Sequence, residues 1–228
     1  LAAHCGLELD PWQQLVLDYT LGERADGKWS AFEVGLCVPR QNGKSKVIEA
    51  RILAGLLLFG EELITYSAHE FKTALEIMRR LEGLLRNSGE KFMPTTSHGQ
   101  EGFEMGARKR QGARVLFQSR TKAGGLGLSG DTVILDEAMW LHEDAIGVLM
   151  PTMATRPNPQ IWYAGSSVDQ EMHPKGYVFS GVRKRGIEGN SPRLCYLEWS
   201  PPEGVERSDP QTWAVSNPSF GYRITEEF

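Results

Sequence analysis

A run of residues early in the chain combines the groups that bind a nucleoside triphosphate. Residues 38–45 read Val-Pro-Arg-Gln-Asn-Gly-Lys-Ser. The last three match the end of a phosphate-binding loop, whereas Val38 stands where that pattern has its first glycine. In such a loop the backbone amides point at phosphate, Lys44 reaches the β and γ phosphates, and the Ser45 hydroxyl binds Mg2+. A chance Gly-Lys-Ser at a helix start is the alternative that this motif alone leaves open.

An acidic pair follows a short apolar stretch later in the chain. Residues 132–135 read Thr-Val-Ile-Leu, and Asp136 and Glu137 come directly after them. At the end of a strand, Asp136 can hold the water shell of the Mg2+ bound at Ser45, while Glu137 is placed to polarise the attacking water as general base. An acidic pair that caps the next helix is the alternative. The two motifs in this order favour an ATPase.

Two further positions are weaker candidates. An apolar run at 160–164 ends in Gly165, Ser166 and Ser167, whose small and hydroxyl residues suit a place that senses the γ phosphate. A common strand-to-loop turn explains them as well. Upstream, the Gln13 amide could contact adenine, because it both donates and accepts hydrogen bonds. An ordinary amphipathic helix with Trp12 in the core explains that segment equally.

Strands and helices alternate around these motifs. We expect strands at 32–38, 63–67, 102–105, 113–118, 132–135, 160–164 and 194–199, and helices starting at Asp10-Pro11, at 44–59, at 71–87 and around 145–149. The pair at 102–105 and 113–118 is expected to form a hairpin. Parallel strands need long crossovers, so this alternation predicts an α/β fold with a mostly parallel central sheet flanked by helices.

The composition is that of an ordinary soluble globular protein, with 228 residues, 40% hydrophobic and 24% charged. We expect one domain and no membrane contact, since the longest apolar stretch, 52–59, is too short to span a bilayer. The three cysteines are widely spaced and indicate a reducing compartment. The net charge of -4 gives no global attraction to nucleic acid. DNA contact would therefore come from the basic clusters 108–110 or 183–185, although short charge runs are more often solvated turns.

Taken together, the motifs resemble the ATPase domain of the large terminase subunit of tailed bacteriophages, a DNA-packaging motor. The resemblance rests on Pro11-Trp12-Gln13, the loop at 40–45, Gly130-Asp131 before the stretch 134–138, and Asn-Pro-Ser-Phe-Gly at 217–221. It covers nearly the whole chain. A loop that lacks the first glycine but carries Arg-Gln-x-Gly-Lys is typical of that family.

The resemblance implies a P-loop NTPase of the ASCE (RecA-like) type that uses ATP and Mg2+. It implies a ring that docks on the portal protein of an empty capsid in the host cell cytoplasm and drives double-stranded DNA inward, with the small terminase subunit as a further partner. The implied site residues are Gln13 near adenine; Pro39, Arg40, Gln41, Asn42, Gly43, Lys44 and Ser45 around the phosphates; Asp136 on Mg2+; Glu137 as base; and Gly165, Ser166 and Ser167 for coupling. Besides Lys44, Arg40 could stabilise transition-state charge in cis.

Two features depart from the family pattern. Related proteins often place an arginine in the glycine-rich loop before the acidic strand, where it reaches a neighbouring subunit's nucleotide. That stretch here is Gly-Gly-Leu-Gly at 124–127, so Arg120 and Lys122 become the candidates for this trans-acting role. The family's subunit also continues into a nuclease domain. We expect 1–222 to be the ATPase (motor) domain, 223–228 to begin the linker, and no nuclease activity from this polypeptide.

Two rival functions stay open at this point. A helicase-type or other nucleic-acid translocase would use the same motifs, but a monomeric helicase needs a second RecA-like domain for which 228 residues leave no space. A non-catalytic scaffold that keeps a nucleotide for structural reasons is the other.

Overall fold

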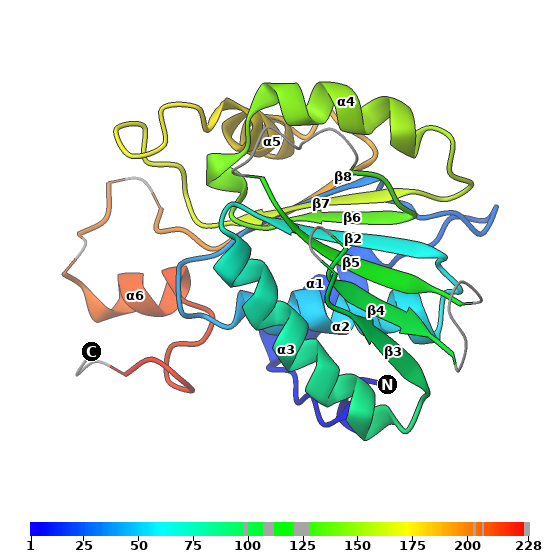
Figure 1. Ribbon diagram of the computed structural model, residues 1–228. Helices are drawn as coiled ribbons and strands as arrows, with labels where there is room; N and C mark the ends of the chain where they lie inside the picture. Colours follow the sequence, from blue (N-terminus) through cyan, green and yellow to red (C-terminus); the bar gives the residue numbers. More distant parts are fainter. Residues whose placement is uncertain (98–99, 107–111, 121–127, 203, 207, 226–228) are drawn as a thin grey trace.

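A central sheet organises the computed structural model, which describes residues 1–97, 100–106, 112–120, 128–202, 204–206 and 208–225 (Figure 1). In this part of the chain the sheet has eight strands in the order β3-β4-β5-β2-β6-β7-β1-β8. They are β1 Glu33–Cys37, β2 Leu63–Ala68, β3 Phe92–Thr95, β4 Gly102–Met105, β5 Arg114–Ser119, β6 Thr132–Leu135, β7 Gln160–Gly165 and β8 Leu194–Glu198. The pairs β3/β4 and β4/β5 are antiparallel, and the other neighbours pair in parallel. The predicted α/β class, mostly parallel sheet and hairpin are confirmed.

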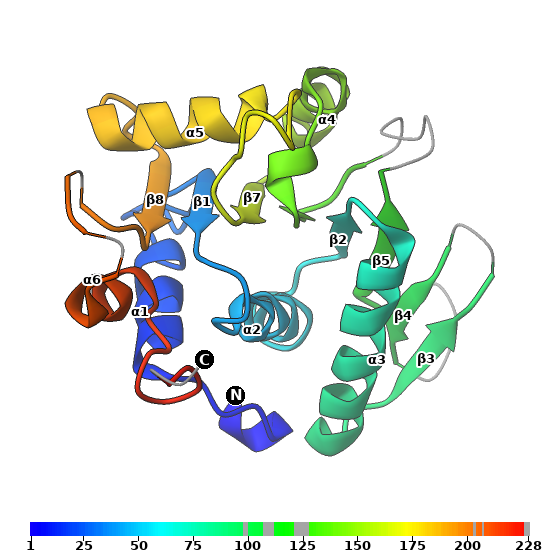
Figure 2. The ribbon, with the colours of Figure 1, turned by 90° about the vertical axis from the view of Figure 1, so that its left-hand side faces the viewer.

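Helices cover both faces of the sheet (Figure 2). On one face lie α1 Pro11–Thr20, α2 Lys44–Leu57 and α3 Phe71–Ser88, and on the other lie α4 Glu143–Met153 and α5 Tyr177–Glu188, while α6 Pro210–Ser216 lies beside α1. Short 3-10 turns occur at Ala3–Cys5 and Ala138–Trp140. Because side chains alternate along a strand, Ile134 of β6 joins the core under α2 and α3, and its neighbours Val133 and Leu135 join the core under α4 and α5.

Three elements escaped the sequence-based prediction. Strand β3 lies at the sheet edge and contains Pro94, a residue tolerated at edges but absent from typical strand patterns. Helix α5 contains Gly186, and a Cβ there would lie 2.4 Å from a ring carbon of Tyr196. Close packing on β8 thus explains a glycine that weakens the helical pattern. Helix α6 has only seven residues.

The described residues after α6 return to the start of α1. Arg223 donates two hydrogen bonds to the Asp10 carboxylate, at 2.8 and 2.9 Å. Phe220 and Ile224 form an isolated bridge. Arg223 and Ile224, which the sequence assigns to the start of a linker, thus contact residues of the predicted domain. The boundary at 222 stays a prediction. Within the described ranges, no helix is both long enough and apolar enough to span a membrane.

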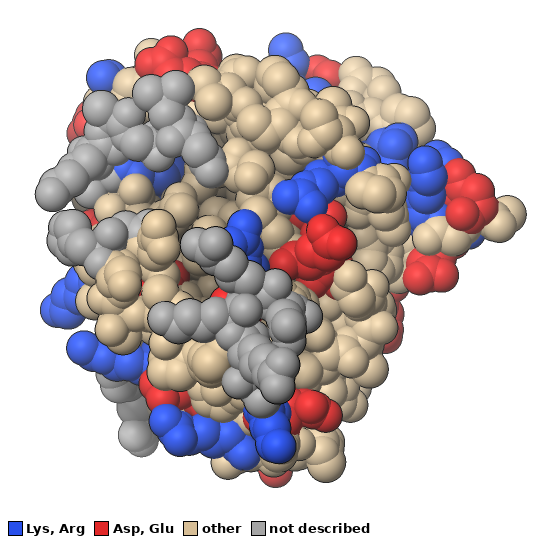
Figure 3. Space-filling view, turned by 45° about the vertical axis from the view of Figure 1, so that its right-hand side comes forward, with Lys and Arg blue, Asp and Glu red and all other residues tan. Residues whose placement is uncertain are grey.

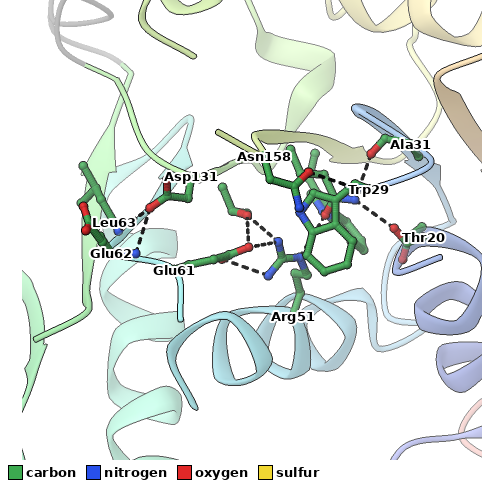
Figure 4. A network of polar contacts seen from close by, with 12 residues as sticks. Thr20, Trp29, Ala31, Arg51, Glu61, Glu62, Leu63, Asp131 and Asn158 are labelled. Atoms are coloured by element: carbon green, nitrogen blue, oxygen red, sulfur yellow. Dashed lines mark hydrogen bonds and ion pairs between the residues drawn. The ribbon is translucent and has the colours of Figure 1, made fainter. Parts of the chain in front are cut away.

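A buried polar network holds the amino ends of the central strands (Figure 4). Arg51 of α2 is fully buried and forms an ion pair with Glu61, which precedes β2. Its guanidinium also donates to the Thr132 hydroxyl at the start of β6 and, at 3.0 Å, to Gln160 at the start of β7. The Gln160 amide in turn donates to the carbonyl of Thr20 at 2.9 Å. Arg51 thereby connects α2 to the starts of β6 and β7, and through Gln160 to the end of α1.

Replacing Arg51 by methionine should lower the free energy of unfolding by about 3–5 kcal/mol, because Glu61 would be left buried without its cation. Chemical denaturation with linear extrapolation measures the change. Arg183→Met is the matched control, since Arg183 is half exposed in its pair with Glu198 and should contribute about 0–1 kcal/mol. Equal losses in the two variants would show that the Arg51 network is not what holds this edge.

Candidate active site

The predicted site residues gather at the carboxyl edge of the sheet. Strand β1 leads into the loop 38–43, β6 leads into Asp136, and β7 ends at Gly165. The Val38 N–H donates to the Gly165 carbonyl at 3.0 Å, and the Asp136 N–H donates to the Ser67 carbonyl at 2.8 Å. Ligands of parallel sheets bind at this edge. The chain therefore brings the phosphate loop, the acidic pair and the predicted coupling residues to one place.

The predicted phosphate loop, which comprises residues 38–43, has a left-handed backbone at two positions. Gln41 has a φ of 65° and Gly43 a φ of 89°, and α2 begins directly after Gly43. A Cβ on Gly43 would also lie 2.8 Å from the Gln13 amide nitrogen, so glycine is required there on two counts. A loop of this shape at a helix start presents backbone N–H groups, the arrangement that binds phosphate.

Gln13 connects α1 to this loop. Its side chain is fully buried; the amide oxygen accepts from the Asp10 N–H at 2.8 Å, and the amide nitrogen donates to the Gly43 carbonyl at 3.0 Å. The structure thus uses the amide within the protein. The predicted adenine contact stays a prediction, because an adenine would have to compete for groups that already bond to Asp10 and Gly43.

Lys44 and Asp136 form an ion pair across the site. The Asp136 side chain is almost fully buried and accepts hydrogen bonds from the Tyr66 hydroxyl and the Glu137 N–H, both at 2.8 Å. Burial alone would raise the pKa of Asp136, but the Lys44 ammonium and these hydrogen bonds outweigh it, so the pKa lies below its ordinary value. The same burial, with Asp136 beside it, raises the pKa of Tyr66 well above its usual range. Asp136 is therefore a carboxylate oriented for cation binding.

Glu137 has an uncommon backbone conformation. Its φ of 52° and ψ of 46° place it in the left-handed region, which costs a non-glycine residue about 1–3 kcal/mol. Its carboxylate accepts from the N–H groups of His69 at 2.9 Å and Glu70 at 3.4 Å, and from the Thr73 hydroxyl at 3.4 Å. These donors lie at the start of α3, where the helix dipole favours a negative charge. The carboxylate of the predicted base is thus anchored at the α3 N-terminus.

Arg120 lies directly after β5 and bonds to its own chain. Its guanidinium donates to the carbonyls of Ser67 and Asp136 and, at 3.3 Å, to that of Glu137. Burial lowers the pKa of Arg120 to about 10, although Asp136 acts in the opposite direction. The sequence suggested Arg120 as an arginine that reaches a neighbouring subunit, and this stays a prediction; in this chain Arg120 bonds to the backbone of the acidic pair. Lys122, the other candidate, lies outside the described residues.

The remaining predicted residues take less central positions. Gly165 is buried at the end of β7, where a Cβ would lie 3.3 Å from the backbone nitrogen of Ala138, so this turn lies close to the acidic pair. Ser166 is half-buried and Ser167 exposed. Arg40 is exposed in the phosphate loop, next to the half-buried Pro39.

Sequence reasoning missed several residues that position the acidic pair. Tyr66, His69 and Thr73 all lie where β2 ends and α3 begins. The signal that identified Asp136, a polar residue at the end of a buried strand, also applies to the end of β2. What that signal indicates at the end of β2 depends on the pairing of β2 with β6, and this pairing cannot be read from the sequence.

The basic cluster 183–185 lies on α5 and not in a turn as the sequence suggested. Arg183 donates to Glu198 at 2.8 and 3.0 Å, and Arg185 donates to Glu33 at 2.7 Å through two nitrogens. Both arginines therefore have carboxylate partners on the sheet, which leaves less of their charge for DNA phosphates. The cluster 108–110 lies outside the described residues.

Comparisons with known proteins identify the fold. No protein-family model matches this sequence, and neither does any curated protein. Among solved structures, the large terminase of bacteriophage HK97 is 17% identical with a TM-score of 0.79, over 97% of this chain and 45% of that chain. The large terminase of a thermophilic bacteriophage, solved in complex with ADP, is 11% identical with a TM-score of 0.62, over 84% of this chain and 46% of that chain.

A third structure is restricted to one domain. The ATPase domain of the Thermus phage P74-26 large terminase is 15% identical with a TM-score of 0.57, over 92% of this chain and 77% of that chain. This chain spans less than half the length of the other two terminases. This chain therefore has the fold of part of the HK97 large terminase and of the ATPase domain of the P74-26 large terminase.

Proposed function

We propose that this chain is the ATP-hydrolysing motor domain of a viral terminase that drives double-stranded DNA into an empty capsid. The observation that carries the ATPase assignment is the ion pair between Lys44 of the phosphate loop and the buried Asp136. It joins the two halves of a nucleotide site that are far apart in the sequence. The terminase of a thermophilic phage, which has a similar fold, was solved with ADP, and this supports nucleotide binding here.

The donor set at this edge fits Mg2+. Mg2+ prefers oxygen ligands and usually combines one or two protein groups with substrate phosphates. Ser45 in the first turn of α2 and the Asp136 carboxylate are the residues that would hold it. In the described part of the chain, no group of three or more acidic, histidine or cysteine side chains could hold a metal ion. The phosphates would therefore complete the shell, and the ion would neutralise charge that develops on them.

The protein groups then have defined tasks. Lys44 exchanges Asp136 for the β and γ phosphates, and the N–H groups of the phosphate loop bind the same anion. Glu137 accepts the proton of the attacking water as general base. Arg40, exposed in the loop, is free to approach the γ phosphate and stabilise its charge in the transition state. Gly165, Ser166 and Ser167 link this chemistry to movement.

Double-stranded DNA, the portal protein and the small terminase subunit are the proposed partners, within a ring that acts in the host cell cytoplasm. The net charge of -4 means that DNA binding relies on local groups. On the face in Figure 3, lysine and arginine side chains form separate groups beside acidic ones. On this face DNA contact would be confined to those groups, and the affinity for DNA should fall with added salt.

The first test separates nucleotide binding from hydrolysis. Glu137→Gln should bind ATP but lose at least about 100-fold in kcat, because an amide cannot accept the proton. Lys44→Ala should lose ATP binding and turnover, since it removes the phosphate contact. Steady-state turnover with Mg2+ and calorimetric titration with ATP measure both. Lys46→Ala is the control, because Lys46 donates to the Glu8 carbonyl outside the site; wild-type turnover by Glu137→Gln would refute the mechanism.

The ring makes a separate prediction. Turnover per chain should rise with protein concentration, because a neighbouring subunit completes each site, and should rise further with double-stranded DNA present. A concentration series of the wild type, with Glu137→Gln as the background, measures this. Turnover per chain that stays constant over the series would place the whole site within one chain.

Arg120 offers a test of cis against trans action. Arg120→Ala should lower kcat by about ten- to a hundredfold, since hydrogen bonds made by a charged group contribute about 1.5–3 kcal/mol. Mixing Arg120→Ala with Glu137→Gln should not restore activity, because the arginine serves the acidic pair of its own chain. Recovery in the mixture, where one subunit supplies the arginine and the other the base, would instead assign Arg120 to the trans role.

A further inference from the structure

The segment 217–223 contacts the phosphate loop. It contains the Asn-Pro-Ser-Phe-Gly motif, to which the proposed function gives no role. The Ser219 N–H donates to the side-chain oxygen of Asn42 at 3.0 Å, and the Ser219 hydroxyl donates to the Asn42 carbonyl at 2.7 Å. The Asn42 amide nitrogen donates to the side-chain oxygen of Asn217 at 3.0 Å. We name residues 217–223 the C-terminal clasp.

The two hydrogen bonds between Asn42 and Ser219 are buried. Asn42 and Ser219 are both 0% exposed. The Asn42 amide nitrogen also lies 3.3 Å from the carbonyls of Pro39 and Arg40, within its own loop. A buried polar group that loses its partner destabilises the structure that contains it. The loop conformation and the clasp are therefore energetically joined at Asn42.

The clasp holds α1 as well. The Trp12 indole N–H donates to the Ser219 hydroxyl at 3.3 Å, and Arg223 is paired with Asp10, the residue that caps α1. Because Gln13 of the same helix donates to the Gly43 carbonyl, the clasp acts on the loop by two routes. One route runs directly through Asn42, and the other runs through Gln13 of α1 to Gly43.

Asn42 is the position in the loop where such support matters. It lies between Gln41 and Gly43, both of which have positive φ. The left-handed conformation is unfavourable for Gln41 and persists only where neighbouring contacts hold it. The Asn42 contacts hold the carbonyls of Pro39 and Arg40 before Gln41 and the Asn42 carbonyl after it. These groups belong to the stretch that is proposed to face phosphate.

We infer that Asn217 and Ser219 are positioning residues, which hold the phosphate loop in its anion-binding conformation through Asn42 and thereby set the affinity for nucleotide. The inference rests on the proposed function for the identity of the ligand. Since coupling between two sites is reciprocal, nucleotide bound at the loop also stabilises the clasp.

The first experiment needs no nucleotide. In the whole chain, Ser219→Ala should increase hydrogen exchange of the backbone amides of residues 40–45 by about three- to tenfold, the loss expected for one or two buried hydrogen bonds. Ser216→Ala is the matched control, because Ser216 is a buried serine whose hydroxyl donates within α6, to the Thr212 carbonyl. Equal exchange of the loop in both variants would overturn the inference.

The second experiment measures nucleotide. The dissociation constant of MgADP, from calorimetry, should rise about three- to tenfold in Ser219→Ala, while kcat at saturating ATP stays within about twofold of wild type. A merely structural role would lower the melting temperature of Ser219→Ala and Ser216→Ala alike without changing affinity. The variant Asn42→Ala combined with Asn217→Ala should bind no more weakly than Asn42→Ala alone, because both substitutions remove the hydrogen bond between the Asn42 amide nitrogen and the Asn217 side-chain oxygen.

The outcomes separate the two proposals. Unchanged MgADP affinity in Ser219→Ala, or additive losses in the double variant, would overturn the role of the clasp and leave the ATPase assignment intact. A wild-type protein that binds no MgADP would overturn the proposed ligand, while the exchange comparison without nucleotide would still decide whether the clasp holds the loop.

Discussion

Parallel pairing of β2, β6, β7 and β1 is the constraint on which the other features of the site depend. The register joins Ser67 to Leu135, Leu135 to Tyr163, and Gly165 to Cys37, so these strands end at nearly the same level. A different segment follows each strand: the start of α3 follows β2, the acidic pair follows β6, the Gly-Ser-Ser turn follows β7, and the predicted phosphate loop follows β1. A slip of one residue would reverse the side-chain directions of a strand, because the side chains alternate. The burial of both sheet faces excludes such a slip.

The side chains at the amino ends of the parallel strands differ in burial from those at the carboxyl ends. We call these two sides of the sheet the amino edge and the carboxyl edge. At the amino edge, Arg51 forms a closed set of contacts with Glu61, Thr132 and Gln160, all of them buried. At the carboxyl edge, Lys44 retains partial exposure beside the buried Asp136. Helix α2 carries Arg51 and Lys44, so it is held rigidly at the edge away from the ligand and presents its N-terminus at the other. Rigid support on one side is what a loop with an unfavourable backbone at Gln41 needs.

The sequence predicted the parts of the site that depend on local pattern. Gly43-Lys44-Ser45 and Asp136-Glu137 are recognisable because each is a short run of defined residue types next to an apolar strand. Tyr66, Thr73 and Arg120 could not be given these positions in this way, because the positions follow from β2 pairing with β6 on one side and β5 on the other, an order that no local pattern encodes. Asn42 and Ser219 are separated by 177 positions, and a pair of small polar residues at that distance carries no signal of contact. For the same reason, the position of Arg120 before the acidic strand was visible in the sequence, but its burial was not.

Three of the groups that would meet a nucleotide already have partners within the protein. Lys44 bonds to Asp136, Gln13 to the Gly43 carbonyl, and Glu137 to the N-terminus of α3. Binding therefore exchanges one set of contacts for another, and the net affinity reflects the difference between them. Asn42 differs from these groups because its partners bury it completely and leave its amide no route to a ligand. Its contribution must come from the shape of the loop, which is why a segment distant in the sequence that bonds to Asn42 can still affect how the loop binds phosphate.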